Sequence, residues 1–182
     1  MSEGWEDGWR AFHHGVRIGR LWVGPPWEQA PEDAIGVVID PGRAFGTGAH
    51  PTTRLCLELL LEQEPTSVLD VGCGSGVLSV AAARLGFAPV TAVDIDEVAL
   101  EVTGANATVN GVAVEVATEL RPASLGVMNI ALDVVERMLP GLPVERAITS
   151  GYLEREEPRV DGWHRLGRRV RDGWAADLLG RV

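Results

Sequence analysis

The sequence predicts an α/β fold with a mostly parallel, twisted sheet, helices on both of its faces and a late antiparallel strand pair. From residue 66 onward, short apolar stretches alternate with stretches of helical periodicity, which is typical of parallel strands joined by crossover helices. A glycine-rich turn at residues 72–76 separates the first of these strands from the first of these helices. Ligands of such sheets bind outside the carboxyl ends of the strands, so this turn marks the edge where we expect a ligand.

Composition narrows the class of protein. A chain of 182 residues is long enough to bury one hydrophobic core, and no apolar stretch reaches the length of a membrane helix. The N-terminus lacks the basic start and apolar core of a secretion signal, so we expect a cytoplasmic protein with no membrane partner. The net charge of −10 argues against a nucleic-acid partner, because such binding depends largely on Lys and Arg. It favours a basic protein or a small cationic ligand.

The first fifty residues are rich in glycine and proline, so the elements predicted there are short. Trp5 and Trp9 lie four apart, as on one face of a short helix. Residues 17–23 and 34–39 predict two strands, and residues 43–51 form a loop rich in glycine. Thr52 or Thr53 is placed to cap the next helix, which residues 62–65 close.

Beyond residue 66 the alternation of elements is regular. The predicted strands are residues 67–71, 90–93, 112–116, 125–130, 147–150, 163–170 and 174–179. The predicted helices are residues 77–85, 97–109 and 131–139. A basic cluster near the end consists of Arg165, Arg168, Arg169 and Arg171. Because it alternates with apolar residues, we interpret it as the solvated face of a late strand or hairpin.

The spacing of three glycines selects the kind of ligand. Gly72, Gly74 and Gly76 let the backbone approach a ligand closely, where any Cβ would collide. A dinucleotide fingerprint needs its third glycine three residues after the second, but Val77 occupies that position. The spacing matches instead the acid-x-Gly-x-Gly-x-Gly turn of S-adenosylmethionine enzymes, with Asp70 as the acid. A nicotinamide cofactor is therefore disfavoured.

An acidic residue follows at the distance expected for a ribose contact. Asp94 lies 18 residues beyond Gly76, at the end of the second strand, where a carboxylate accepts both ribose hydroxyls. A helix cap is the structural alternative, and we assign the ribose to Asp94 and the cap to Asp96. A metal held by these two carboxylates is less favoured. Cys56 and Cys73 are too few for a zinc site, so we expect no metal.

Six segments together resemble one known family. The run DPGRAFGTGAHPTTRLCL at residues 40–57 resembles the signature loop of the ribosomal protein L11 methyltransferase (PrmA) family. Residues 68–76, 93–96, 106–111, 129–130 and 150–153 follow in the order that this family shows. The resemblance spans nearly the whole chain. It implies a Rossmann-like class I methyltransferase fold and methyl transfer from S-adenosyl-L-methionine to a protein amine, on a lysine side chain or at an N-terminus.

The resemblance and the glycine turn together assign the site. The cofactor contacts are assigned to Phe45, Gly46, Thr53, Asp70, Gly72, Gly74, Gly76, Asp94, Ile95 and Asn129. The catalytic positions beside the transferred methyl are assigned to Asn129, Thr47 and His50. Structural alternatives stay open, since Thr53 could only cap a helix and Phe45 only pack. His50 could only hold its loop, and Asn129 could only satisfy buried backbone. Methyl transfer needs alignment and exclusion of water more than a strong acid or base.

Three departures from the family pattern concern the methyl acceptor. The resemblance begins near residue 5, so we expect the separate N-terminal domain that presents the ribosomal substrate in the family to be absent. Met128 and Ala131 stand where the family usually has alanine and leucine, and residues 124–126 replace an acidic start of that strand. The alternatives are therefore a small-molecule methyltransferase and a pseudo-enzyme that binds the cofactor or a partner without turnover. We expect one domain over residues 1–182, with an N-terminal helix and strands in residues 1–45 and the cofactor-binding core in residues 46–182.

Overall fold

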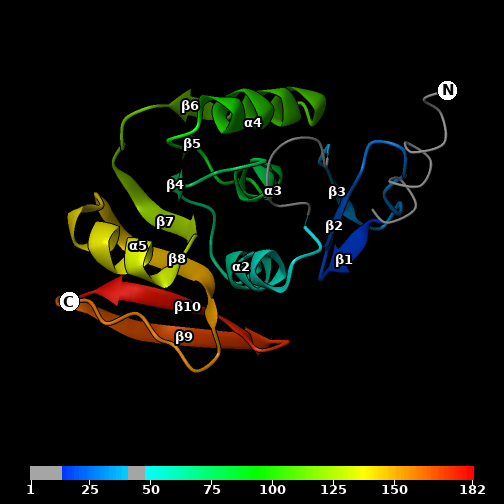
Figure 1. Cartoon of the computed structure of the whole chain (residues 1–182). Helices are drawn as coiled ribbons and strands as arrows, with labels where there is room; N and C mark the ends of the chain where they lie inside the picture. Colours follow the sequence, from blue (N-terminus) through cyan, green and yellow to red (C-terminus); the bar gives the residue numbers. More distant parts are fainter. Residues whose placement is uncertain (1–13, 41–47) are drawn as a thin grey trace, which may run out of the picture.

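A computed structural model describes residues 14–40 and 48–182 and contains two sheets (Figure 1). The larger sheet has seven strands in the order β6-β5-β4-β7-β8-β10-β9. These strands are β4 (Val68–Val71), β5 (Val90–Val93), β6 (Glu115–Ala117), β7 (Ala123–Asn129), β8 (Val144–Leu153), β9 (Trp163–Arg171) and β10 (Trp174–Arg181). Strands β4 to β8 are parallel, whereas β10 is antiparallel to both β8 and β9. The predicted α/β fold, with its late antiparallel pair, is confirmed.

Helices cover both faces of the larger sheet (Figure 1). They are α2 (Pro51–Leu61), α3 (Val77–Arg84), α4 (Glu97–Val109), α5 (Leu132–Met138) and the 3-10 helix η1 (Leu139–Gly141). Successive residues of a strand point to opposite faces. On β4, Val68 joins the hydrophobic cluster of α2 and α3, whereas Leu69 and Val71 join that of α5 and η1. Among the described residues, no helix has the length and apolar character needed to cross a membrane.

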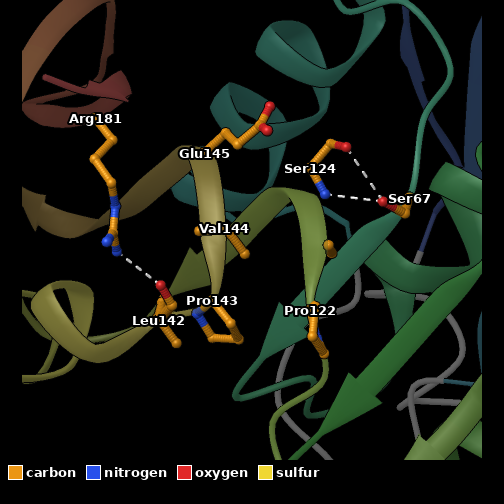
Figure 2. A pocket seen from close by; sticks show the side chains of 9 residues that line it. Ser67, Pro122, Ser124, Leu142, Pro143, Val144, Glu145 and Arg181 are labelled. Carbon is orange, nitrogen blue, oxygen red and sulfur yellow. Dashed lines mark hydrogen bonds between the residues drawn. The ribbon is translucent and has the colours of Figure 1, made fainter.

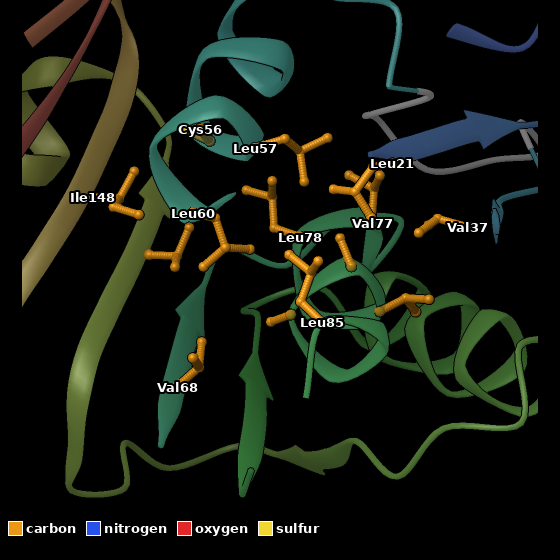
Figure 3. Close-up of a cluster of buried hydrophobic side chains, with 14 of the residues drawn as sticks. Leu21, Val37, Cys56, Leu57, Leu60, Val68, Val77, Leu78, Leu85 and Ile148 are labelled. Carbon is orange, nitrogen blue, oxygen red and sulfur yellow. The ribbon is translucent and has the colours of Figure 1, made fainter. Parts of the chain in front are cut away.

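The larger hydrophobic cluster also includes the smaller sheet (Figure 3). Leu57 and Leu60 of α2 pack with Leu78 of α3, and all three side chains are buried. Burial of one such side chain stabilises the fold by roughly 1.5–3 kcal/mol. Leu21 and Val37 of the smaller sheet belong to the same cluster. The two sheets therefore share one core, which fixes the smaller sheet beside α2 and α3.

The smaller sheet corrects one sequence prediction. Its strands are β1 (Val16–Ile18), β2 (Leu21–Gly24) and β3 (Ile35–Val38), with β1 antiparallel and β3 parallel to β2. The prediction of a single strand over residues 17–23 is wrong, because a turn at Gly19 and Arg20 divides it into a hairpin. Gly19 has φ of 55°, a left-handed conformation that glycine adopts without strain. The strand predicted at residues 34–39 is confirmed as β3.

Several boundaries of the larger sheet can be compared with the predictions. Strand β5 and helix α4 begin and end as predicted. Strand β6 begins at Glu115, later than the predicted start at residue 112. Strand β8 is longer than residues 147–150, because it pairs with β7 along one side and β10 along the other. The helix predicted around Trp5 and Trp9 lies outside the described residues.

The basic cluster of β9 is paired with carboxylates. The pairs are Arg165 with Glu157 at 3.0 Å, Arg168 with Asp177 at 2.9 Å, Arg169 with Glu62 at 2.7 Å and Arg171 with Glu58 at 2.7 Å. The interpretation of this cluster as a solvated face is wrong for Arg168, whose side chain is 20% exposed against a fully buried Asp177. Much of the positive charge at this edge is therefore neutralised within the chain.

A depression of about 470 Å³ lies at the amino-terminal edge of β4, β7 and β8 (Figure 2). Two pairs of polar groups in it are bonded to each other. Ser67 Oγ accepts a hydrogen bond from the Ser124 amide at 2.8 Å, and Arg181 Nη2 donates to the Leu142 carbonyl at 2.8 Å. This edge holds the strands together, and the residues expected to bind a ligand lie at the opposite edge.

Candidate functional site

The glycine turn follows β4 directly and has a backbone that only glycine adopts easily. Gly72, Gly74 and Gly76 have φ of 76°, 53° and 76°. A Cβ on Gly72 would lie 2.6 Å from Cγ2 of Ile130, and a Cβ on Gly76 would lie 2.8 Å from the Thr103 side chain. Conformation and space therefore both exclude larger residues at Gly72 and Gly76. The amide of Gly72 donates to the Val93 carbonyl at 2.8 Å, which holds the turn against the end of β5.

Asp94 connects this turn to the start of α4. Its Oδ2 accepts a hydrogen bond from the Gly74 amide at 3.0 Å, and its Oδ1 accepts from the Asp96 amide at 3.0 Å. Asp96 in turn caps α4 by accepting from the Val98 amide at 2.9 Å, as predicted from the sequence. Each ionised carboxylate oxygen accepts more than one hydrogen bond, so Asp94 retains capacity for ligand hydroxyls.

Asn129 and Thr53 meet on the other side of the same edge. Asn129 ends β7, and Thr53 lies in the first turn of α2. The amide Nδ2 of Asn129 donates to the Thr53 hydroxyl at 3.3 Å. This bond uses the amide nitrogen and leaves the carbonyl Oδ1 to accept a hydrogen bond from another group. The pair fixes an acceptor atom beside the glycine turn.

A cavity of about 520 Å³ joins these groups, a size within the range of small-molecule sites. The glycine turn, Asp94, Asn129 and Thr53 line it. Apolar side chains from separate segments contribute to the wall, among them Leu78, Ile95, Leu120, Ile130, Val134 and Met138. Ile95 is fully exposed at the rim, which is unusual for so large an apolar side chain unless a ligand or partner covers it.

The structure brings together most of the residues predicted for the site. Thr53, Gly72, Gly74, Asp94, Ile95 and Asn129 all line the cavity. Gly76 lies at the N-cap of α3, next to the lining residues. Phe45, Gly46 and Thr47 lie outside the described residues.

Asp70 lies behind the glycine turn and does not line the cavity. Its side chain is 1% exposed, and its Oδ2 accepts a hydrogen bond from Ser79 Oγ at 2.6 Å. Burial raises the pKa of Asp70 to about 6, against the opposing effect of the Ser79 hydrogen bond. The carboxylate therefore ties the end of β4 to α3 beneath the turn.

His50 holds the start of its helix and does not line the cavity, and its catalytic assignment stays a prediction. It is the N-cap of α2, where a Thr cap was expected, and its Nδ1 lies 2.8 Å from Thr52 Oγ1. The prediction that Thr52 or Thr53 caps this helix is wrong, because the helix begins at Pro51 and its cap therefore lies two residues before Thr52. The His50 ring also stacks edge-on against Trp174, with ring centroids 5.1 Å apart.

Sequence reasoning missed most of the apolar wall. Val134 and Met138 lie four residues apart on α5, and this spacing was available in the sequence. Leu120 lies in the irregular segment after β6, where no pattern marks it. Cys73 also lines the cavity, and burial raises the pKa of its thiol to about 12, so it remains protonated. Within the described residues, no group of three or more His, Cys, Asp or Glu side chains is arranged to hold a metal ion.

A parallel sheet with a glycine cradle, an acidic residue after the next strand and a polar pair facing them defines the Rossmann-like methyltransferase class. Within that class, the chain belongs to the ribosomal protein L11 methyltransferase (PrmA) family, whose model matches residues 1–172. The family resemblance found in the sequence is thereby confirmed. The methyl donor of this family is S-adenosylmethionine.

Individual relatives agree with the family. The ribosomal protein L11 methyltransferase of Geobacter sulfurreducens is 47% identical over an alignment of 181 positions that covers 91% of this chain and 60% of that protein. Its counterpart from Shewanella pealeana is 48% identical over an alignment of 160 positions that covers 82% of this chain and 54% of that protein. The chain thus spans little more than half the length of these curated relatives.

Solved structures agree with the fold. A ribosomal protein L11 methylase from Lactobacillus delbrueckii subsp. bulgaricus has a TM-score of 0.80 and 27% identity, covering 92% of this chain and 98% of that one. An rRNA methylase from Escherichia coli has a TM-score of 0.57 at 18% identity, over 74% of this chain and 68% of that one, and shows the fold alone.

Proposed function

We propose that this chain is an S-adenosylmethionine-dependent methyltransferase that methylates an amine nitrogen of a protein. The observation that carries the proposal is the single cavity shared by the glycine turn, Asp94 and the Asn129–Thr53 pair. Ribosomal protein L11 is the proposed acceptor, because relatives at 43% to 48% identity are named for methylating it. A ribosomal acceptor agrees with the cytoplasmic location expected from the sequence. The shared core of the two sheets supports one domain.

The residues that line the cavity fit the cofactor. The glycine turn presents bare backbone, so the methionine part can lie directly over Gly72 and Gly74. Asp94 is the residue to receive the ribose hydroxyls, since its carboxylate is held in place by two backbone amides. Ile95 and Leu120 form an exposed apolar rim of the kind that an adenine ring would cover.

The chemistry required of the chain is mainly positioning. When bound, S-adenosylmethionine supplies an electrophilic methyl group on a sulfonium. Thr53 fixes the amide of Asn129, so Oδ1 can accept a hydrogen bond from an incoming amine and orient its lone pair. Ile130, Val134 and Met138 keep water from that side of the cavity. An apolar wall also disfavours a charged ammonium, so it favours the neutral amine, which is the nucleophilic form.

The test is calorimetric titration of the chain with S-adenosylhomocysteine, alongside Asp94→Ala and Asp96→Ala. We expect saturable one-site binding, weakened at least about tenfold by Asp94→Ala, which is about 1.4 kcal/mol. Asp96→Ala is the matched control, because its side chain caps α4 and does not line the cavity. It should change the affinity by less than about twofold, or about 0.4 kcal/mol.

Transfer of a labelled methyl group then identifies the acceptor. Label on ribosomal protein L11 supports the proposed substrate, and label on free amines alone supports the small-molecule alternative. Binding without transfer to any acceptor in a cell extract supports the pseudo-enzyme. Absence of binding by the unaltered chain would rule out the proposed function.

A further inference from the structure

One polar face of α4 contacts both the glycine turn and the smaller sheet. Thr103, Asn106 and Asn110 lie at helical spacing along this face. Thr103 and Asn106 are 0% and 2% exposed, so their polar atoms need partners inside the protein. Thr103 Oγ1 donates to the carbonyl of Gly74 at 3.2 Å. Through Thr103, α4 therefore contacts the glycine turn that we assign to the cofactor.

Asn106 bonds in two directions. Its Nδ2 donates to the Ser75 carbonyl of the glycine turn at 2.8 Å. Its Oδ1 accepts from the backbone amide of Asp40, two residues beyond the end of β3, at 3.2 Å. The side-chain amide is planar and rigid, so an orientation that satisfies Ser75 also sets the position of the oxygen that holds Asp40.

Asn110 holds the same strand but does not bond to the turn. Its Oδ1 accepts from the Val38 amide at 2.8 Å, and its Nδ2 donates to the Val38 carbonyl at 2.6 Å. Strand β3 is an edge strand of the smaller sheet, and Asn110 supplies backbone partners that a neighbouring strand would otherwise provide. The two asparagines therefore share an anchoring role, and Asn106 adds a contact with the turn.

We propose that Asn106 is a positioning residue that couples cofactor binding at the glycine turn to the end of β3. The inference rests on the proposed function. A cofactor lying over Gly72 and Gly74 restricts the turn and with it the Ser75 carbonyl. Asn106 then holds the Asp40 amide more firmly, and by linkage a firmly held β3 favours the bound turn to the same degree.

The test is hydrogen exchange of peptides that cover residues 35–40, with and without saturating S-adenosylhomocysteine. In the unaltered chain, we expect the ligand to slow exchange by about fivefold or more, the lower end of typical coupling between sites. In Asn106→Ala the slowing should fall below about twofold, although calorimetry still shows binding. In Asn110→Ala exchange should be faster without ligand, because an anchor is lost, and the ligand should still slow it.

A second variant covers the case in which Asn106→Ala does not fold. Asn106→Ser keeps a polar side chain at this buried position, but its single short hydroxyl cannot hold the Ser75 carbonyl and the Asp40 amide together as the asparagine amide does. The slowing by ligand should fall below about twofold in this variant as well. Equal slowing in the unaltered chain and the Asn106 variants would overturn the coupling, as would binding to the unaltered chain without any slowing. No calorimetric binding to the unaltered chain would overturn the proposed function and this inference with it.

Discussion

The Thr53 hydroxyl accepts a hydrogen bond from Asn129 Nδ2 at 3.3 Å, which joins residues 76 positions apart in the sequence. Thr53 is fully buried in the first turn of α2, and Asn129 ends a central strand of the sheet. A buried hydroxyl in this position has few other partners to choose from. The bond therefore decides which atom of the Asn129 amide faces the cavity.

Removing that hydroxyl should impair transfer more than cofactor binding. We expect Thr53→Val, which keeps the shape of the side chain, to lower the transfer rate by about tenfold, the effect of losing one hydrogen bond. The affinity for S-adenosylhomocysteine should change by less than about twofold, since Asp94 and the glycine turn are intact. Rate and calorimetric affinity measured on the same preparation check both parts. Thr91→Val, in the buried strand β5, controls for the loss of a buried hydroxyl. An unchanged transfer rate in Thr53→Val would show that the orientation of Asn129 does not contribute to transfer.

Asp70 should make stability fall as the pH rises. Burial raises its pKa from 3.8 to about 6, so the folded chain holds this proton more tightly than the unfolded chain. The stabilisation is fully present below the unfolded pKa and is lost as the pH rises from about 4 to about 6, by an amount on the order of 3 kcal/mol. Urea unfolding at several pH values should show a shallower decline for Asp70→Asn than for the unaltered chain. The exposed Asp161→Asn should keep the decline, and identical curves for the unaltered chain and Asp70→Asn would contradict the assignment.

Two neighbouring arginines of β9 should differ sharply in their contribution to stability. Arg168 is paired with Asp177, whose carboxylate is fully buried and also accepts from the Tyr152 hydroxyl at 2.8 Å. Burial raises the pKa of Asp177 in spite of these partners. Arg168→Met removes the nearer cation and leaves that buried carboxylate only Arg165, whose Nε lies 3.9 Å from Oδ1, so it should lower the free energy of unfolding by about 3 kcal/mol. Arg169→Met is the matched control, because its ion pair with Glu62 is nearly half exposed and should contribute less than about 1 kcal/mol. Equal losses in urea unfolding would show that burial of Asp177 does not set the difference.

Gly151 should tolerate no side chain, because β8 passes very close to the end of β7 there. Its φ is 101°, and a Cβ would lie 2.2 Å from the Ile130 carbonyl oxygen. Gly151→Ala should therefore lower the free energy of unfolding by more than about 2 kcal/mol and weaken binding of S-adenosylhomocysteine, since Ile130 lines the cavity. Gly162→Ala is the control, because Gly162 has φ of 78° and open space around it. This variant should lower the free energy of unfolding only by the strain of a left-handed alanine, about 1 kcal/mol. Similar losses of stability for both variants in thermal unfolding would show that β8 shifts to accommodate the added Cβ, so that the contact with Ile130 does not exclude it.

Much of the site could be predicted because its signals are local in the sequence. The alternation of Gly72, Gly74 and Gly76 after an apolar strand predicts a turn whose backbone can approach a ligand closely, and in the structure Gly72 and Gly74 line the cavity. The cap at Asp96 and the extent of α4 follow from residues within a few positions of each other. These features need no knowledge of how the strands are ordered.

Other features could not be predicted from the sequence, because they depend on residues that are distant along the chain. The turn at Gly19 within an apolar stretch is hard to distinguish from a glycine inside a strand. The N-cap of α2 is His50, whose ring also packs on Trp174. Trp174 belongs to β10, which is far from His50 in the sequence. The arginines of β9 were predicted to be solvated because their carboxylate partners lie on other elements and cannot be paired with them from the sequence.

The sequence by itself determined the α/β fold, the glycine cradle, the acidic residue after β5 and the family. The tertiary structure alone decided that Thr53 holds Asn129, that Asn106 joins Ser75 to Asp40, and that residues of α5 complete the apolar wall. The reason is physical. Backbone conformation and helix capping are set by residues a few positions apart, whereas contacts between elements follow from the order in which strands pair, and that order is fixed only when the whole core packs.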